Sequence, residues 1–554
     1  MRNIPLKSIF LSAAALILVQ SLSAQTASQP AAKPAAPASF VLTPENYHPF
    51  ISEFQAQEQA IRQEAKVGTP SNTDDPWQWM LANIPWFECS NADFQQTYYF
   101  RWYAFQKHVY HAADGDQLSE FLSTGDTGGQ GATVVDAAEH HLREARWLRS
   151  PKLANDYARF WLEPSNARNH NYSVALADAV NEVTLATGNT HLGTYLLSSM
   201  VDNYHAWERA QKDTNGLFWS VDTHDAMEVS ISGDGYRPTL NSYMYADARA
   251  ISRFANITGD RDLAGEFAQK ADAQHKLIDT ELWNANDRFY EVISPAKDSP
   301  IRQDRKFKDN GTALKISGVR ELIGYIPWYF NIPAADRDDA WKQLFDPKGF
   351  NGLYGPTTAE RRSPRYRFET NDKCPWNGPT WAFATTQTLV AMANVLNRGD
   401  QHVVSNHDYY QLFSNYVHAQ RLQMKNGTII PWTDEAQDPD TGEWITREHL
   451  ITKQSPQQGR GAYYNHSGFA DPLITGLLGL RPSQDNLLII NPLLPANEWS
   501  YFAIDGLPYH GHLLTLLYDP TGERYHHGKG MTLLVDGKHA VSRPNFGPLF
   551  YTIK

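Results

Sequence analysis

A repeat of about 70 residues in the middle of the chain restricts the folds that this sequence can adopt. Thr187-Gly188-Asn189 is echoed 71 residues later by Thr258-Gly259-Asp260, and Leu217-Phe218-Trp219 is echoed at the same interval by Arg288-Phe289-Tyr290. Chains with internal repeats of this length build their fold from one supersecondary unit used several times. The content of one unit therefore decides the fold class.

Each unit holds two helices. Apolar residues recur at i, i+3, i+4 and i+7 over 192–212 and 263–282, which is the spacing of an amphipathic helix. In each copy a glycine ends one helix, a short polar turn follows and a second helix begins. A third copy fits less well, with Arg398-Gly399-Asp400 between helices predicted over 381–396 and 410–424. The unit is therefore a helical hairpin.

Six such hairpins occupy roughly 420 residues, close to the span from 45 to 480. A closed ring of six hairpins buries an inner layer of helices and presents loops at one end, where a pocket forms. An open α-solenoid is the alternative, but it needs more regular repeats than these. The sequence therefore predicts a mainly α fold, an (α/α)6 barrel, over residues 41–482.

The C-terminal stretch lacks the helical repeat and consists of short apolar runs. Short runs rich in Leu and Ile, or other apolar residues, at 486–492, 512–518 and 531–535 are separated by glycines, which is typical of antiparallel strands. We therefore predict a small C-terminal β-domain over 483–554. Residues 40–110 are interpreted as the start of the helical domain.

The N-terminus is typical of a secretory signal. Arg2 and Lys7 supply positive charge, and residues 9–19 are apolar but too short for a stable membrane anchor. We predict a signal peptide over 1–24 and, from its Ala, Pro, Ser and Lys content, a disordered linker over 25–40. The expected location is the periplasm or the outside of the cell, with no membrane attachment after cleavage.

Composition narrows the possible functions. The net charge of −12 argues against a nucleic-acid partner. Cys89 and Cys374 cannot form a disulfide framework in so long a chain, and we expect two buried thiols near each other rather than a catalytic pair. The 16 Trp and 27 Tyr exceed what a core needs, and such a surplus is common where grooves stack sugar rings.

The segment from Trp432 to Gly442 carries the clearest chemical signal. Pro439 and Gly442 force this loop to turn, and it gathers the four carboxylates Asp434, Glu435, Asp438 and Asp440. A carboxylate that handles a proton, next to an aromatic face that stacks a sugar ring, is what glycoside chemistry requires. The alternative is a surface Asx-Pro turn whose acids face water.

A second acidic region contains Asp225 and Glu228, just before a helix that Pro238 helps to start. The alternative for Glu228 is an acid that favours a helix N-terminus. A third string holds Trp376, Gly378 and Trp381, where a Gly-Pro turn brings two Trp side chains close to the start of a helix. Two core Trp residues are the alternative there.

These three strings resemble motifs of glycoside hydrolases with an (α/α)6 barrel, the group of trehalases, glycoside hydrolase family 63 glucosidases and mannosylglycerate-hydrolase-like enzymes. Residues 435–442 read E-x-x-D-P-x-T-G, like the general-base loop of that group, and residues 376–381 read W-x-G-P-x-W, like an element lining the subsite of the cleaved sugar. The acid loop of the group reads S-G-x-D-x-S. Here Glu228 stands where Asp is usual and Asp225 where Ser is usual. Weaker matches extend over most of the span from 77 to 481.

The resemblance implies an inverting glycoside hydrolase that acts from the end of an α-linked oligosaccharide or glycoside. It implies Glu228 as the proton donor, with Asp225 as its rival, and Glu435 as the base, roughly 6.5–9.5 Å from the donor with water between them. The residues implied in binding the sugar are Trp86, Arg101, Trp147, Asp225, Arg237, Asn241, Trp376, Gly378, Trp381 and Trp432. A structural role is the alternative for each.

Two other functions stay open. A polysaccharide lyase can use a similar helical ring, and the run Tyr463-Tyr464-Asn465-His466 would suit it. A non-catalytic glycan-binding protein would explain the exchange of Asp for Glu at position 228. No metal or cofactor is expected, because the adjacent His140 and His141 would point to different sides of a helix. The acidic loop also lacks the spacing of an EF-hand.

Overall fold

The inner wall of the fold is a ring of six helical segments: α4 (Ala138–Ala145), α6 (Leu176–Thr187), α9 (Pro238–Thr258), α11 (Ile326–Tyr329), α12 (Ala382–Arg398) and α15 (Ala470–Pro472). The computed structural model describes residues 40–65, 67, 70, 72–122, 133–163, 167–295 and 314–554. Each segment packs against the next, and α15 packs back against α4, so the ring is closed. This arrangement confirms the predicted (α/α)6 barrel.

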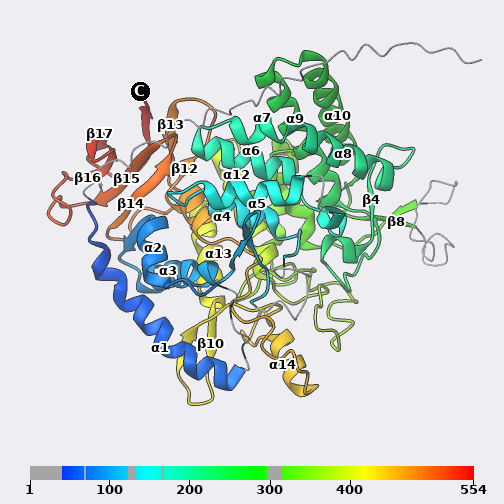
Figure 1. Cartoon of the computed structure of the whole chain (residues 1–554). Coiled ribbons are helices and arrows are strands. Elements are labelled where there is room, and N and C mark those ends of the chain that lie inside the picture. The colour runs from blue at the N-terminus through cyan, green and yellow to red at the C-terminus, as the bar shows by residue number, and fades with distance from the viewer. Residues whose placement is uncertain are drawn as a thin grey trace, which may run out of the picture. The chain divides into compact units, whose positions relative to one another are not determined.

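A second layer of helices covers the ring (Figure 1). It contains α1 (His48–Ala65), α2 (Pro76–Asn83), α3 (Ala92–Lys107), α5 (Lys152–Leu162), α7 (His191–Tyr195), α8 (Leu197–Gln211), α10 (Arg261–Glu281), α13 (Asn406–Ala419) and α14 (Ile445–Thr452). The two layers differ in burial. Every residue of α4 is buried, whereas α10 buries one stripe, at Ala264, Phe267, Ala271, Gln274 and Ile278. That i, i+3, i+7 stripe is the signature of a helix with one face on the core.

The glycines that mark the repeat end three inner helices. Gly188, Gly259 and Gly399 follow α6, α9 and α12 and have φ angles of 69°, 82° and 78°. An L-residue with a side chain rarely adopts this left-handed conformation, so glycine terminates the helix at low cost. The aromatic marks of the repeat lie on the short strands β4 (Trp219–Ser220) and β7 (Phe289–Tyr290). The predicted helix ends are therefore confirmed.

The C-terminal region forms two antiparallel sheets, as predicted, but one of them draws a strand from the N-terminal part. The five-stranded sheet has the order β1 (Trp86–Cys89), β14 (Phe502–Tyr509), β15 (His512–Asp519), β16 (Gly530–Val535) and β17 (Lys538–Arg543). The other contains β12 (Leu480–Arg481), β13 (Leu487–Ile490) and β18 (Leu549–Thr552). Trp86 pairs with Asp505, and residues 39–554 form one compact unit. In Figure 1 strands β14 to β17, in orange and red, lie beside α2. Strand β1 was not predicted, because four residues give too short a pattern to recognise.

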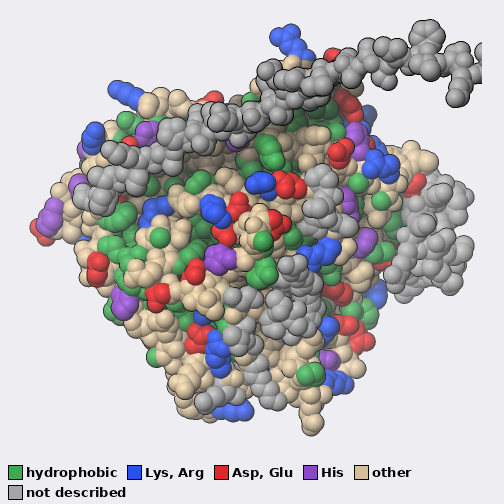
Figure 2. Space-filling view, viewed as in Figure 1, with side chains coloured by type: hydrophobic (Ala, Val, Ile, Leu, Met, Phe, Trp, Pro, Cys, Tyr) green, Lys and Arg blue, Asp and Glu red, His purple; other side chains and the backbone are tan. Residues whose placement is uncertain are grey.

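The remaining elements are short and connect the helices. They are η1 (Pro44–Tyr47), β2 (Val109–Ala112), β3 (Gly115–Leu118), η3 (Ala167–His170), η4 (Asp222–Asp225), β5 (Gly235–Tyr236), β6 (Trp283–Asn284), β8 (Ile293–Pro295), β9 (Leu314–Ile316), η6 (Leu322–Tyr325), η7 (Ala335–Gln343), β10 (Arg421–Gln423), β11 (Ile429–Pro431) and η8 (Leu473–Leu477). On the face shown in Figure 2, acidic and basic side chains are interspersed.

Two predictions concern the chain's relation to membranes. The signal peptide and linker predicted over 1–40 lie, except for Phe40, outside the described residues. Among the residues that the structure describes, no helix combines the length and the apolar character needed to cross a bilayer.

Candidate active site

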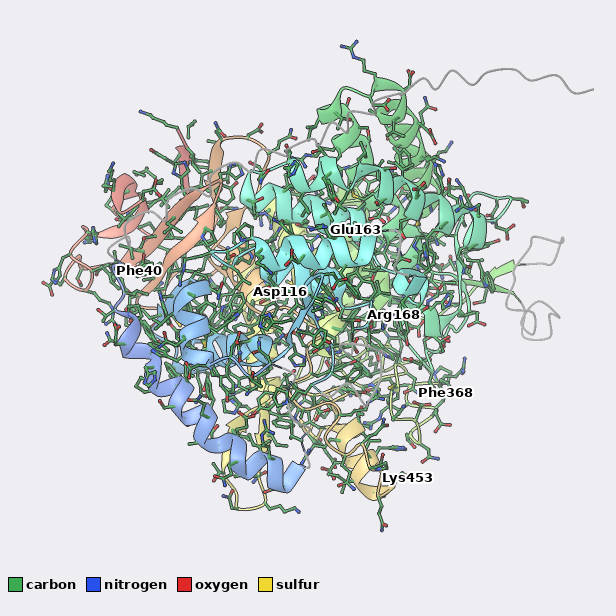
Figure 3. The ribbon with its side chains drawn as sticks, in the orientation of Figure 1. Phe40, Asp116, Glu163, Arg168, Phe368 and Lys453 are labelled. Atoms are coloured by element: carbon green, nitrogen blue, oxygen red, sulfur yellow. The ribbon has the colours of Figure 1, made fainter. Side chains whose placement is uncertain are left out.

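A cavity of about 490 Å³ lies among the loops that precede the inner helices, a volume in the usual range for ligand sites. Asp136 precedes α4, Tyr172 precedes α6, Glu228 precedes α9, Trp376 precedes α12 and His466 precedes α15, and all five line the cavity. The N-terminal ends of five inner helices therefore converge on it, and such ends favour negative charge. In Figure 3 Arg168, another lining residue, lies on the same loop-rich side of the molecule as Phe368 and Lys453.

Glu228 lies on a strained loop. Its neighbours Ala226 and Val229 have φ angles of 56° and 64°, which residues with a Cβ rarely adopt. Such conformations cost about 1–3 kcal/mol each and persist only where surrounding contacts hold them. Those contacts include the amide of Ile231, which donates to Glu321 Oε1 at 2.7 Å. The loop is thus fixed at a backbone cost, as is common where a functional side chain must be aimed.

Asp225 and Arg237 supply the other contacts that hold this loop. Arg237 Nε and the hydroxyl of Thr239 both donate to Asp225 Oδ2, and Ser173 Oγ donates to Oδ1 at 2.5 Å. Arg237 also donates to the carbonyl of Gly233 at 2.6 Å. Neither side chain of the ion pair has any exposed surface, and neither lines the cavity. Asp225 and Arg237 therefore support the loop, and neither side chain lines the described cavity.

Glu228 has a raised pKa. Burial is the largest cause, and the nearby carboxylates of Asp136, Asp222 and Glu435 add to it, giving a pKa of about 7. Among the described residues no Lys, Arg or His lies within ion-pair distance of this carboxyl, and a hydrogen bond to the backbone of Glu228 itself offsets the loss of hydration only in part. A carboxyl in this state is protonated near neutral pH and can donate a proton.

Glu435 lies directly behind the cavity wall. Its side chain is fully buried, Arg460 Nε donates to Oε1 at 2.5 Å and Arg460 Nη2 donates to Oε2 at 2.9 Å. The thiol of Cys374 lies 3.5 Å from Oε2. Arg460 and Cys374 line the cavity, so they separate Glu435 from it. A two-point contact with a guanidinium is typical of an ionised carboxylate.

The other acids of this loop have different tasks. Asp434 accepts the amide of Glu435 at 2.8 Å and the indole N–H of Trp432 at 3.1 Å, so Trp432 supports the loop and is fully buried. Asp438 accepts the amides of Asp440 and Thr441 at 3.0 Å each, which forms an Asx turn. The predicted turn therefore lies in the second half of this segment, and the buried acids Asp434 and Glu435 lie in the first half.

Trp376 and Trp381 form one wall of the cavity. Their rings stack with centroids 4.6 Å apart and an interplanar angle of 11°. The indole N–H of Trp381 donates to the carbonyl of Pro375 at 3.0 Å, which fixes the pair. Gly378 does not line the cavity, and a Cβ there would meet Tyr366 at 2.8 Å. Its role is therefore to allow close packing of the turn.

Four further residues proposed to bind the sugar lie elsewhere. Trp86 packs in β1 against Tyr47, and Trp147 donates its indole N–H to Asp471 at 2.7 Å. Arg101 is bonded to Tyr416, Gln420 and Ser467, and the amide of Asn241 donates to the carbonyls of Phe218 and Arg237. None of the four lines the cavity. These side chains do not reach the cavity because each lies in the core, where it packs against or bonds to another element of the fold.

Several polar residues that line the cavity were not proposed as site residues from the sequence, among them Glu120, Asp136 and His466. Glu120 and Asp136 interact through their carboxyl groups, and the hydroxyl of Tyr464 donates to Glu120. Burial, followed by the charge of Asp136, raises the pKa of Glu120 well above its usual value. Burial raises the pKa of Asp136 to about 6. His466 also lines the cavity, and the run containing it and Tyr464 had been noted only as a possible lyase feature.

The two cysteines are free thiols in different surroundings. Cys89 lies in β1 and donates to the carbonyl of Asn91 at 3.2 Å, whereas Cys374 lies at the cavity beside Glu435. Within the described ranges no cluster of three or more His, Cys, Asp or Glu side chains is arranged to hold a metal ion. His141 contacts the hydroxyl of Tyr157 and the carbonyl of Asn465, and His140 packs on Phe383.

Comparisons with known proteins agree on one class. Residues 131–467 match the family model for the mannosylglycerate hydrolase MGH1-like glycoside hydrolase domain, and residues 480–541 match the glycosyl hydrolase family 65 C-terminal domain. A solved structure named sialidase is 36% identical, with 92% of this chain and 45% of that chain aligned and a TM-score of 0.82.

Two rhamnosidase structures are similar in fold alone. The GH78 family rhamnosidase of Bacillus sp. GL1 is 12% identical over 81% of this chain and 41% of its own, with a TM-score of 0.51. The α-L-rhamnosidase of Streptomyces avermitilis is 10% identical over 85% of this chain and 41% of its own, with a TM-score of 0.50. This chain spans less than half the length of each of these three proteins.

Proposed function

Because this chain belongs to the family of mannosylglycerate hydrolase MGH1-like glycoside hydrolases, we propose that it cleaves a glycosidic bond with inversion of the anomeric centre. In this proposal Glu228 is the general acid and Glu435 the general base. The substrate is an α-linked oligosaccharide or glycoside that is cleaved from its end. Export through the signal peptide over 1–24 belongs to the same proposal.

One observation carries the proposal: two carboxyl groups at the same cavity lie in opposite electrostatic surroundings. Glu228 is buried among other carboxylates, and its pKa is about 7. Glu435, in contrast, accepts a hydrogen bond from Arg460 at each of its oxygens. An inverting glycosidase needs one protonated carboxyl for the leaving oxygen and one ionised carboxylate for water. The carboxyl without a cation partner suits the acid role, and the carboxylate bonded to a guanidinium suits the base role.

As the base, Glu435 must be reached by water through the wall of the cavity. Glu435 has no exposed surface, and Cys374 and Arg460 lie between it and the cavity. Each carboxylate oxygen has two lone pairs, so Glu435 can hold a water molecule while it still accepts bonds from Arg460. The attacking water must therefore enter past the thiol of Cys374 when the substrate is bound.

The similar structures do not identify the sugar that this chain would cleave. The protein named sialidase is more than twice as long as the part that this chain matches, and its activity can reside in the remainder. The rhamnosidases share the fold at 10–12% identity. The sugar is therefore best sought with a panel of aryl glycosides and natural oligosaccharides.

The decisive experiment follows the product by NMR during the first turnovers. The first-formed sugar should have the anomeric configuration opposite to that of the substrate, and a retained anomer would remove Glu435 from its role as base. Glu435→Gln should abolish hydrolysis of every substrate. Glu228→Gln should lose about 10²–10⁴-fold with a poor leaving group and much less with an aryl group that departs without a proton.

The control is Glu443→Gln, an exposed carboxylate on the same loop as Glu435, which should leave all rates unchanged. If the wild-type protein binds glycans but hydrolyses none of them, and both Gln variants behave like it, the chain is a glycan-binding protein instead.

A further inference from the structure

We propose that Arg249, Arg253 and Arg481 form a binding site for a small oxyanion, a phosphate or carboxylate group, in a second cavity of the ring. This cavity has a volume of about 310 Å³, and none of its lining residues lines the site cavity described above. The inference therefore goes beyond the proposed function and does not depend on it.

The second cavity lies towards the other end of the ring. It is lined by residues 245–253 of α9, by Asn394 of α12, and by Arg146 and Asn331, which follow α4 and α11. The N-terminal ends of the inner helices meet at the site cavity, so these later parts of the helices point away from it. A ligand in the second cavity would not compete with the sugar.

The lining of the second cavity has an excess of positive charge. It contains the arginines Arg143, Arg146, Arg249, Arg253 and Arg481 and the acids Asp178, Glu182 and Asp471. Glu139 pairs with Arg143 from outside the lining and adds one more negative charge. Burial raises the pKa of Asp178 to about 7 and keeps the pKa of the neighbouring Asp247 well above its usual value, so these two acids add little negative charge. The cations therefore outnumber the anions at neutral pH.

Two of the five arginines use all the acids of the lining. Arg143 pairs with Asp178 at 3.0 Å, Arg146 pairs with Asp471 at 2.6 Å, and both arginines pair with Glu182. Arg249, Arg253 and Arg481 form no ion pair with a described residue and donate to neutral groups instead. The excess charge is therefore carried by these three guanidinium groups.

Arg481 lies on β12 and keeps two donors for a ligand. Its Nη2 donates to Asn394 Oδ1 at 2.7 Å, whereas Nε and Nη1 have no partner among the described residues and keep exposed surface. Burial lowers the pKa of this guanidinium, and the positive charge of Arg146 lowers it further, although more distant acids act in the opposite direction. An anion that accepts from either nitrogen would supply the negative charge that the surroundings lack.

Arg253 and Arg249 lie one helical turn apart on α9. Arg253 donates to Asn181 at 2.7 Å and to Gln484 at 3.3 Å, which leaves Nη2 without a partner in the described part of the chain. Arg249 donates to the hydroxyl of Tyr245 at 3.3 Å and is exposed. Both arginines also line an open neighbouring cavity of about 590 Å³, which gives an ion a path from solvent. Guanidinium groups suit phosphate and carboxylate oxygens because their donors match the geometry of these anions.

A bound oxyanion would connect two parts of the fold. Arg481 belongs to β12, which pairs with β13 of a C-terminal sheet, whereas Arg249 and Arg253 belong to the inner helix α9. A ligand that binds only the folded protein stabilises it, and the stabilisation increases with ligand concentration. We therefore expect the anion to raise the melting temperature of the protein.

The test is isothermal titration of the whole protein with inorganic phosphate and with malonate, at neutral pH and constant ionic strength with chloride as the balancing anion. At least one of the two should bind with a dissociation constant of about 1 mM or tighter. The tighter ligand then tells whether the site prefers phosphate or carboxylate oxygens. If neither anion binds at a tenfold higher concentration, the proposal is wrong.

Variants assign the binding to the second cavity. Arg253→Met and Arg481→Met should each raise the dissociation constant at least tenfold, or about 1.4 kcal/mol. Arg209→Met removes an exposed cation of α8 outside this cavity, matches the change in net charge and should leave the affinity unchanged. Unchanged affinity in Arg253→Met and Arg481→Met, or an equal loss in Arg209→Met, would refute the site.

Thermal unfolding supplies the remaining control. It checks that each variant is folded, and Arg249→Met, at an exposed position, replaces either variant that is not. The tighter anion should raise the melting temperature of the wild type and of Arg209→Met, and not that of Arg253→Met. An equal rise in all three would reveal a general salt effect and overturn the proposal. No substrate is used, so these results are independent of the roles of Glu228 and Glu435.

Discussion

Two polar cavities in the described part of the molecule differ in how their acidic side chains are paired. The second cavity, of about 310 Å³, is lined by Arg143, Arg146, Asp178, Glu182 and Asp471. There Arg146 donates to Glu182 at 2.6 Å and to Asp471 at 2.6 and 2.9 Å, and Arg143 donates to Asp178 at 3.0 Å and to Glu182 at 3.1 Å. Each of these five charges has an opposite partner, whereas Arg249, Arg253 and Arg481, which line the same cavity, bond to neutral groups among the described residues.

The site cavity leaves several polar groups without such partners. Glu228 has no cation within ion-pair distance in the described part of the chain, and the ring nitrogens of His466 have no protein partner there. Burial, followed by the charge of Asp136, raises the pKa of Glu120 well above its usual value. Paired charges hold the helices of the ring together. Unpaired polar groups raise the free energy of the empty site, and a ligand that bonds to them lowers it again. The acids that line the second cavity therefore have cation partners, whereas Glu228 in the site cavity has none among the described residues.

The largest effect is expected from Arg146→Met in the paired cavity. The substitution leaves Asp471 and Glu182 without their strongest donor in a buried setting, and such a loss typically costs about 3–5 kcal/mol. Urea unfolding at neutral pH measures it. The matched variant is Lys373→Met in the site cavity, where the cation is exposed and makes no ion pair with a described residue. Its stability should stay within about 0.5 kcal/mol of the wild type. Equal losses in the two variants would remove the distinction between the cavities.

The second effect concerns the pH dependence of catalysis. Burial and the carboxylates of Asp136, Asp222 and Glu435 give Glu228 a pKa of about 7. A general acid must be protonated, so kcat/KM should fall as pH rises through about 7, by tenfold for each further pH unit. Rates measured from pH 5 to 9 on one substrate check this. The alkaline fall should disappear in Glu228→Gln with an aryl glycoside that needs no proton, and its persistence would assign the titration to another group.

The sequence predicted the features that depend on a local pattern, such as helix ends. It did not predict contacts that form only when the ring closes. The ends of α6, α9 and α12 were predicted because Gly188, Gly259 and Gly399 act within one turn of the chain. The loops of Glu228 and Glu435 were found through a motif. Glu120 and Asp136 belong to no motif and meet Tyr464 only because the ring closes.

Several residues predicted to bind the sugar lie in the core, away from the cavity, for a related reason. Arg237, Asn241, Arg101 and Trp147 are polar or aromatic residues within or beside inner elements, and from sequence alone they resemble residues that face a ligand. In the structure each makes buried bonds to neighbouring elements, such as Trp147 with Asp471. The direction in which such a side chain points is set by tertiary packing, which a single sequence does not encode locally.

A smaller effect is expected at Gly461, which lies against the loop that carries the base. A Cβ there would stand 1.8 Å from Asp434 Oδ1 and 3.4 Å from the Cγ of Glu435. Gly461→Ala must therefore push this loop outward, at about 1–3 kcal/mol as for other overpacked sites, and kcat should fall as Glu435 moves. The control is Gly265→Ala in α10, where a Cβ meets nothing within 4 Å, and it should be neutral or slightly stabilising. Denaturant unfolding and rates on the same preparations compare the two.

The last effect concerns the contribution of Glu228 to stability as a function of pH. Its pKa rises from 4.5 in the unfolded chain to about 7 in the folded protein, so the folded state binds the proton more tightly. Between these two values stability must fall as pH rises, because the folded protein must either keep the proton or bury a charge. Glu228→Gln removes this penalty. The variant should therefore match the wild type near pH 4.5, become more stable than it as pH approaches 7, and keep that advantage above pH 7. Urea unfolding at a series of pH values measures the difference, and Glu443→Gln, an exposed acid, should show no such trend. A constant difference across the range would mean that Glu228 has a cation partner, and the contrast between the two cavities would no longer hold.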